Sequence, residues 1–188
     1  MREVCTKIRE NFALYKTLIG KEKRIDALII ILEDAAHKNW KAKKENLTHD
    51  SGEEIIFDAA KQKYGLKYGL KIFVKQLNQG PVFYFDSDGP AHTIRDGKTK
   101  LSETKIKTPH FNFYDENGIK QAKRNEFIEN NEDTLQNDIN TGMQLFCQET
   151  NINKQDNIPS ILENAEKLPI HYNPNIDIHR HVDFSNES

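Results

Sequence analysis

The stretch that decides the fold most clearly is residues 105–114, KIKTPHFNFY. Polar and aromatic side chains alternate along its second half, and an alternation with a period of two predicts a β-strand with two different faces. One face carries His110, Asn112 and Tyr114, and the other carries Phe111 and Phe113. We therefore expect the two phenylalanines to enter a core and the polar trio to face a cleft or solvent.

Further strands are predicted on both sides of this segment. The turn at residues 116–118, ENG, leads into a partner strand over residues 119–124. Earlier in the chain, residues 70–74 and 82–85 have extended patterns, and the turn NQG at residues 78–80 separates them. Short turns of this kind join antiparallel strands, so the centre of the chain is expected to form a mainly antiparallel sheet.

Apolar residues at three- and four-residue steps predict helices before and after the strands. The expected helices cover residues 2–19, 21–39, 51–64, 133–150 and 158–168. This order predicts an α+β fold with an N-terminal helical hairpin, a central sheet and C-terminal helices packed on it. The corresponding segments are a helical hairpin or appendage (1–47), an α+β core domain (48–168) and a polar C-terminal tail (169–188).

Composition excludes several classes of protein. A chain of 188 residues suits one domain with an appendage, and its longest apolar run, residues 27–32, is too short to cross a membrane. Two cysteines, Cys5 and Cys147, fit free thiols in a reducing cytoplasm better than a disulfide framework. The chain has no Gly-rich phosphate loop, dinucleotide fingerprint, Gly-x-Ser-x-Gly elbow or Cys-x-x-Cys zinc motif, so no cofactor and no metal are predicted.

Residues 92–110 carry the candidate functional site. Two histidines that can change charge near neutral pH bound a segment with a net charge of +3, which predicts an anion site. The candidate catalytic residues are His92, His110 and Tyr114. The candidate nucleic-acid contacts are Arg95, Lys98, Lys105, Lys107 and Asn112, joined by Trp40, which lies among lysines and can stack on a base.

Three runs of this sequence resemble a group of small uncharacterised bacterial proteins. They are FDSDGPAHTIRDG at residues 85–97, TPHFNFYDENG at 108–118 and FCQETNI at 146–152. Members of that group are encoded on mobile elements or near toxin–antitoxin and phage-defence genes, and have a His-Thr turn followed by a His-x-His-x-Tyr strand. The resemblance selects His92, Thr93, His110 and Tyr114, whereas the middle histidine of the strand motif is Asn112 here.

Three functions remain open on these observations. The first is binding of RNA, or another phosphate-containing ligand, through the basic histidine-containing face. The second is metal-independent RNA cleavage, in which His92 and His110 transfer protons while nearby cations stabilise the charge on phosphate. The third is a protein–protein module whose acidic C-terminal third, with a net charge of −6 over residues 119–188, engages a basic partner.

The C-terminal tail contains a possible metal cluster. His179 and His181 would point the same way on an extended strand, and Asp177 or Asp183 could join them around a divalent ion. His171 lies nearby in sequence. An arginine between the two close histidines and the absence of a cysteine pair favour a solvated tail instead.

Overall fold

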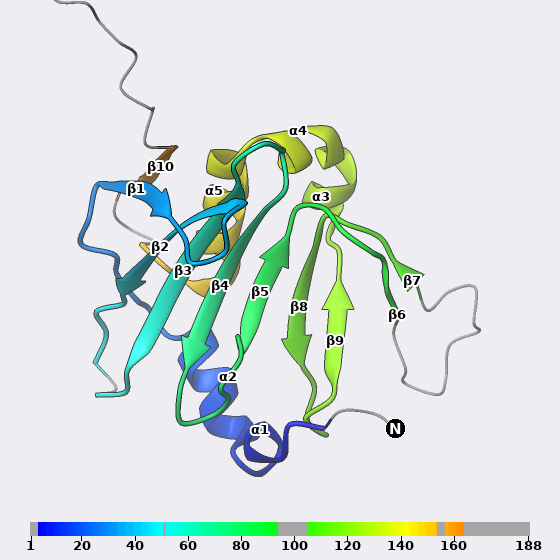
Figure 1. The fold of residues 1–188 in the computed structure, drawn as a ribbon. Helices are drawn as coiled ribbons and strands as arrows, with labels where there is room; N and C mark the ends of the chain where they lie inside the picture. The colour runs from blue at the N-terminus through cyan, green and yellow to red at the C-terminus, as the bar shows by residue number, and fades with distance from the viewer. Residues whose placement is uncertain (1–3, 51, 94–104, 154–156, 164–188) are drawn as a thin grey trace, which may run out of the picture.

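The computed structural model describes residues 4–50, 52–93, 105–153 and 157–163. Its main feature is a twisted sheet with the strand order β10-β1-β2-β3-β4-β5-β8-β9 (Figure 1). The strands are β1 (Ile29–Asp34), β2 (Trp40–Asn46), β3 (Ile55–Gln62), β4 (Tyr68–Val74), β5 (Phe83–Asp86), β8 (His110–Tyr114), β9 (Lys120–Lys123) and β10 (Ser160–Glu163). All neighbouring pairs are antiparallel except β1 and β10, which run parallel.

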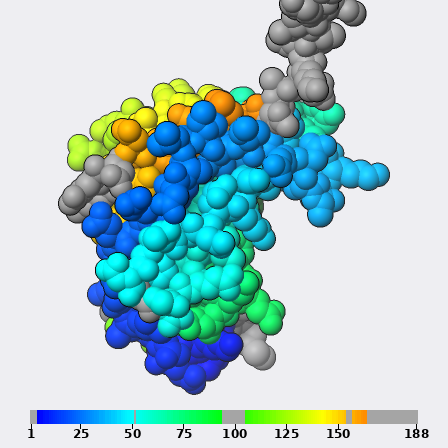
Figure 2. All heavy atoms as spheres, turned by 90° about the vertical axis from the view of Figure 1, so that its left-hand side faces the viewer, coloured from blue at the N-terminus to red at the C-terminus, as the bar shows by residue number. Residues whose placement is uncertain are grey.

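A separate two-stranded ribbon of β6 (His92–Thr93) and β7 (Lys105–Ile106) lies beside the β9 edge (Figure 1). The helices are α1 (Thr6–Glu10), α2 (Phe12–Gly20), α3 (Glu126–Asn130), α4 (Glu132–Asn137) and α5 (Ile139–Thr150). At the opposite edge, the hairpin of β1 and β2 projects from the body of the protein (Figure 2). The α+β class is therefore confirmed, with a mainly antiparallel sheet at its centre.

The hydrophobic core lies between the sheet and α5. Phe146 of α5 packs its ring 5.9 Å from those of Phe57 and Phe83 and 6.5 Å from that of Phe111. Each of these three partners comes from a different strand, so one aromatic cluster joins the helix to β3, β5 and β8. The sheet face that carries Phe57, Phe83 and Phe111 is therefore the face that α5 covers.

Three of the helix predictions are wrong, because the described residues of these segments form strands. Residues 29–34 form β1, residues 55–62 form β3 and residues 160–163 form β10. Ile29, Ile30 and Ile31 are β-branched, and β-branched side chains favour strands. In β3, Ile55, Phe57 and Ala59 point to the core with a period of two, and pairing with β2 and β4 satisfies the backbone on both sides. Apolar runs this short fit both the helical period of 3.6 residues and the strand period of two residues. Pairing with neighbouring strands therefore selects the strand conformation.

The N-terminal helical hairpin is therefore only half correct. Its first helix is present as α1 and α2, but the second is replaced by a segment that ends in β1. Because β1 and β2 belong to the large sheet, residues from the expected appendage and the expected core share one sheet. The longest described helix, α5, has 12 residues, and none of the described helices is long and apolar enough to cross a membrane.

Candidate functional site

Strands β5 and β8 place four polar side chains together on the sheet face opposite α5. Asp86 pairs in register with His110, and Tyr84 pairs with Asn112. Side chains of directly paired antiparallel residues point to the same side of a sheet. With Asp58 of β3 and Lys71 of β4, which are paired with each other, they form what we call the polar face: Asp58, Lys71, Tyr84, Asp86, His110 and Asn112.

The structure brings the two candidate catalytic histidines together. His92 reaches the polar face from β6, and its ring centroid lies 6.2 Å from that of His110, with an angle of 68° between the ring planes. His92 is half-buried, whereas His110 is only 2% exposed. Of the two alternatives predicted for this strand face, a cleft or solvent, His110 therefore has the first, since it lines a cavity.

The hydrogen bond at the His110 ring fixes which nitrogen can act as a base. Its Nδ1 lies 3.2 Å from the backbone carbonyl oxygen of Lys107. A carbonyl oxygen only accepts hydrogen bonds, so Nδ1 carries the proton and Nε2 of the neutral ring has a lone pair. Burial lowers the pKa of His110, which favours this neutral form, while the Lys107 carbonyl and Asp86 partly oppose the shift.

Asp86 lies where a proton taken up by His110 would be stabilised. Its Oδ2 is 3.9 Å from Nε2 of His110 and accepts a hydrogen bond of 3.0 Å from Nδ2 of Asn112. Burial raises the pKa of the Asp86 carboxyl, and the opposing influences include His110, Lys71 and Lys67. Asn112 therefore orients the carboxylate, and Asp86 favours the imidazolium form of His110.

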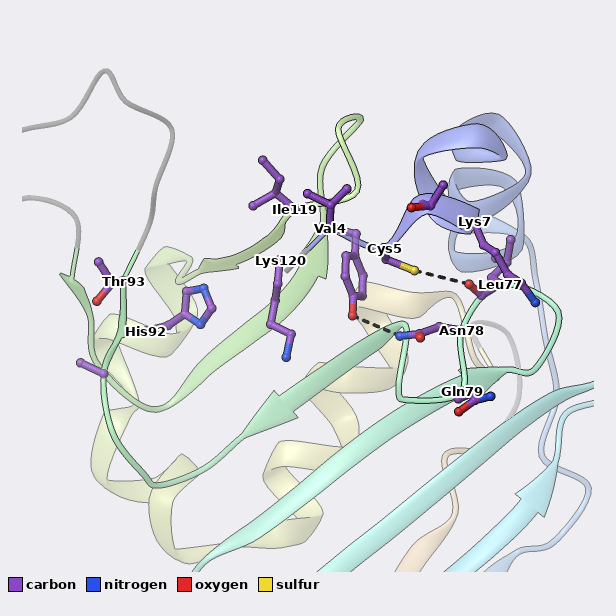
Figure 3. A pocket seen from close by; sticks show the side chains of 13 residues that line it. Val4, Cys5, Lys7, Leu77, Asn78, Gln79, His92, Thr93, Ile119 and Lys120 are labelled. Carbon is purple, nitrogen blue, oxygen red and sulfur yellow. Dashed lines mark hydrogen bonds between the residues drawn. The ribbon is translucent and has the colours of Figure 1, made fainter. Parts of the chain in front are cut away.

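Two cavities adjoin at His92. The smaller, about 240 Å³, is lined by Lys67, Tyr84, Asp86, Asp88, Gly89, Pro90, Ala91, His92, Thr108, His110 and Asn112. The larger, about 610 Å³, is bounded by the N-terminal segment 4–7, the turn at 77–79, β6, and Tyr114, Ile119 and Lys120. Ala91 and His92 line both cavities. Figure 3 shows the His92 ring pointing from β6 towards Lys120 of β9.

Cations accompany the carboxylates on this side of the sheet. Lys120 lies over the Tyr84 ring, 5.3 Å from its centroid. Lys71 faces the site between Asp58 and Tyr84 in the cross-strand row. Asp58 is 7% exposed, its Oδ1 has no hydrogen-bond partner within the described part of the chain, and burial raises its pKa. The lysines therefore provide positive potential beside the histidine pair, and they counter the buried carboxylates.

The other predicted site residues are distributed differently from the expectation. Tyr114 lines the larger cavity, where its hydroxyl accepts a 3.1 Å hydrogen bond from Nδ2 of Asn78. Lys107 forms an ion pair with Glu132, with a shortest N–O distance of 2.8 Å, and Lys105 is exposed on β7. Arg95 and Lys98 lie outside the described residues.

Trp40 does not join the histidines. Its strand, β2, is separated from β8 by β3, β4 and β5, which corresponds to about 19 Å across the sheet at the usual strand spacing. Register places Trp40 on the same side of the sheet as His110, because Ala42, two residues further along, connects through Ala60, Gly69 and Asp86 to His110. Only an extended ligand could contact both Trp40 and His110.

Sequence reasoning missed several residues of the site, notably Asp86, Lys71, Tyr84 and Asn78. A signal for two of them was present, since Tyr84 and Asp86 alternate with Phe83 and Phe85 in the run FYFD. The same period of two that identified His110 and Asn112 would have put Tyr84 and Asp86 on a polar side. Nothing in the sequence indicates that Asn78 lies against Tyr114, which depends on how the chain folds.

The described residues contain no group of three or more histidine, cysteine or acidic side chains that could hold a metal ion. The tail residues His171, His179, His181, Asp177 and Asp183 lie outside the described part of the chain. Both cysteines are free thiols. Burial raises the pKa of Cys147 to about 12, which makes this thiol a packing residue rather than a nucleophile.

Comparison with protein-family models, with curated proteins and with solved structures yields no match for this chain. The resemblance carried by His92, Thr93, His110 and Tyr114 thus stays a prediction.

Proposed function

We propose that the protein binds RNA at the polar face and cleaves its phosphodiester bonds, with His110 as general base and His92 as general acid. The observation that supports this proposal is the 6.2 Å between the two ring centroids at a shared cavity. A phosphate group between two rings at this separation can place one oxygen within hydrogen-bond reach, about 2.6–3.2 Å, of each imidazole. Proton transfer at both ends of a phosphodiester then needs no other titratable group.

The neutral form of His110 assigns it the role of base, which leaves the role of acid to His92. The neutral form of His110, with its proton on Nδ1, offers Nε2 as the base. In the proposed step, Nε2 removes the 2′-hydroxyl proton, the 2′-oxygen forms a bond to phosphorus, and the bond from phosphorus to the 5′-oxygen breaks. Protonated His92 donates its proton to that departing oxygen. The products are a 2′,3′-cyclic phosphate and a free 5′-hydroxyl; His110 has gained the 2′-hydroxyl proton and His92 has given its proton to the 5′-oxygen.

The surrounding charges favour the products of this transfer. Asp86, with Oδ2 3.9 Å from Nε2, stabilises His110 once it has gained a proton. Lys67 lines the smaller cavity and Lys71 lies in the neighbouring cross-strand row, so both can offset the extra negative charge that develops on phosphate. Exposed Lys105 on β7 adds a contact for the RNA backbone.

A toxin–antitoxin or phage-defence role, implied by the resemblance, and a cytoplasmic location stay predictions. The protein–protein function through the acidic C-terminal third also stays a prediction, and no observation on the described residues favours it over RNA cleavage.

The proposal is tested by incubating a mixed RNA pool with the full-length protein at low salt and analysing the ends of the products. The parent should give 2′,3′-cyclic phosphate and 5′-hydroxyl ends, and His92→Ala should not. His37→Ala is the matched control, because His37 is exposed in the β1–β2 turn, away from the polar face, and should retain full cleavage.

The results also separate cleavage from binding. If the folded parent binds the pool but leaves it intact, the catalytic roles are wrong and the protein is an RNA-binding module. If the parent neither binds nor cleaves the pool, the RNA proposal fails and the protein–protein function takes its place.

A further inference from the structure

We propose that the larger cavity beside His92 is a nucleoside-binding subsite, which holds the nucleoside that leaves with the 5′-oxygen. This inference rests on the proposed function, because it assigns the two sides of the scissile phosphate to two cavities. It extends that function by naming the substrate class: an oligonucleotide with a nucleoside on the 5′-oxygen, rather than a simple phosphate ester.

The position of His92 supports the assignment. His92 lines both cavities, whereas His110 lines only the smaller one. A general acid must touch the departing oxygen, and a general base must touch the attacking hydroxyl. The nucleoside bearing the 2′-hydroxyl therefore lies on the His110 side, and the group attached to the departing oxygen extends past His92 into the larger cavity.

The cavity has room and fixed walls for a nucleoside. Its volume of about 610 Å³ falls within the range of small-molecule sites. One wall is the N-terminal segment, fixed by a bridge between Val4 and Ile119 and by a 2.8 Å hydrogen bond from the Cys5 amide to the Gly118 carbonyl. The adjoining wall is the turn with Leu77, Asn78 and Gln79, where the Cys5 thiol donates to the Leu77 carbonyl at 3.5 Å (Figure 3).

Asn78 and Tyr114 present complementary polar atoms in this cavity. Nδ2 of Asn78 donates to the Tyr114 hydroxyl at 3.1 Å (Figure 3). The hydroxyl oxygen accepts this bond and keeps its own proton for a ligand, while Oδ1 of Asn78 is an acceptor. A donor and an acceptor lie side by side, as on an amide. Every nucleobase has an edge with an adjacent acceptor and donor, so the pair suits bases in general with little preference among them.

A free phosphate or a small ester would not use these groups. Of the cavity residues, Lys7 and Lys120 can contact an anion, but the Asn78–Tyr114 pair is neutral and its geometry matches a planar ligand with two polar atoms. The nucleoside assignment therefore predicts that Asn78 matters only for substrates whose leaving group is a nucleoside.

Two substrates separate these cases in a kinetic test on the full-length protein. Uridylyl-(3′→5′)-adenosine has a leaving nucleoside, and uridine 3′-(4-nitrophenyl phosphate) has none. We expect Asn78→Ala to lower kcat/KM about tenfold on the dinucleotide, the scale of one hydrogen bond, and to leave the aryl ester within about twofold. Tyr114→Phe should have the same selectivity. Gln76→Ala, an exposed change in the same turn outside the cavity, should affect neither substrate. Equal losses on both substrates, or none on either, would overturn the subsite.

A binding measurement keeps the subsite testable without catalysis. The uncleavable 2′-deoxy dinucleotide is titrated into ¹⁵N-labelled protein while the side-chain amide signals of Asn78 are followed by NMR, with inorganic phosphate as the comparison. The dinucleotide should shift these signals and phosphate should not. A shift without cleavage of either substrate would mean that the subsite is correct and the catalytic proposal wrong. Signals that stay unchanged with the dinucleotide would exclude the subsite, whether or not the protein cleaves RNA.

Discussion

His92 and His110 lie with their ring centroids 6.2 Å apart, although His92 is on the short ribbon at the sheet edge and His110 is buried within the main sheet. The two residues therefore differ in what they do for stability. His110 is held by its Nδ1 hydrogen bond to the Lys107 carbonyl and is enclosed, whereas His92 is half-buried at the junction of two cavities.

His110→Ala should lower the free energy of unfolding by about 1–3 kcal/mol, because it removes the hydrogen bond between Nδ1 and the Lys107 carbonyl and opens a void at a buried side chain. His92→Ala should change it by less than about 1 kcal/mol, as is usual outside the core. Urea unfolding measures both values. If His110→Ala unfolded at the same urea concentration as the parent, the conclusion that the His110 side chain is buried would be wrong.

Asp86→Asn should stabilise the protein at neutral pH. The folded-state pKa of Asp86 is raised by burial, so the parent loses stability as the pH rises from the unfolded value near 3.8 through the folded-state pKa. Asparagine keeps the shape and removes this loss. The stability difference between variant and parent should therefore be present at pH 7 and disappear below about pH 3.8, where Asp86 is protonated in both states. A variant that is less stable than the parent at pH 7 would show that the carboxylate is net stabilising.

Phe111→Ala should be far more destabilising than Phe113→Ala. Phe111 is fully buried against Phe83, Phe85 and Phe146, and its loss should cost about 3–5 kcal/mol. Phe113 is half-buried and lines a cavity of about 550 Å³ beside α2, so its loss should cost less, about 1–2 kcal/mol. Thermal unfolding of the two variants compares them directly, and equal costs would contradict the assigned burial.

Lys71→Gln should weaken RNA binding and reduce its salt dependence. Lys71 belongs to the polar face. Loss of its one phosphate contact should lower the slope of log affinity against log salt concentration by about 1. Lys75→Gln is the control, since Lys75 lies after the end of β4 and pairs with Glu54 at 2.8 Å. Lys107→Gln should have a smaller effect than Lys71→Gln, because Lys107 is already paired with Glu132. Identical slopes for Lys71→Gln and Lys75→Gln would place the RNA elsewhere.

Much of the central sheet could be predicted because its strands have two chemically different faces. The alternation of His110, Phe111 and Asn112 identified β8. The stripe of Leu135, Ile139, Met143 and Phe146 predicted one helix over residues 133–150, which the structure divides into α4 and α5. The edge strands were missed for a physical reason. Residues 29–32 are a short apolar run whose helical and extended patterns coincide, and only the pairing of β1 with β2 and β10 selects the strand.

The candidate site was predicted in part. The histidines and Asn112 were found because titratable and polar groups recur near turns and on one strand face. Asp86 and Asn78 depend on which strands become neighbours, since β5 joins β8 across 23 intervening residues, 87–109, and the Asn78 turn meets Tyr114 only in the folded protein. The sequence could not predict the burial of His110 either, because it depends on which segments pack around β8 in the folded protein.

The activity of His92→Ala should depend on the leaving group of the substrate. A general acid matters for the 5′-oxygen of RNA, which must be protonated as it leaves, and matters little for 4-nitrophenolate, which leaves as an anion. When kcat/KM is measured on both substrates, His92→Ala should lose about 10²–10⁴-fold on uridylyl-(3′→5′)-adenosine and keep most of its activity on uridine 3′-(4-nitrophenyl phosphate). An equal loss on both substrates, or full activity on both, would contradict the proton-transfer role of His92.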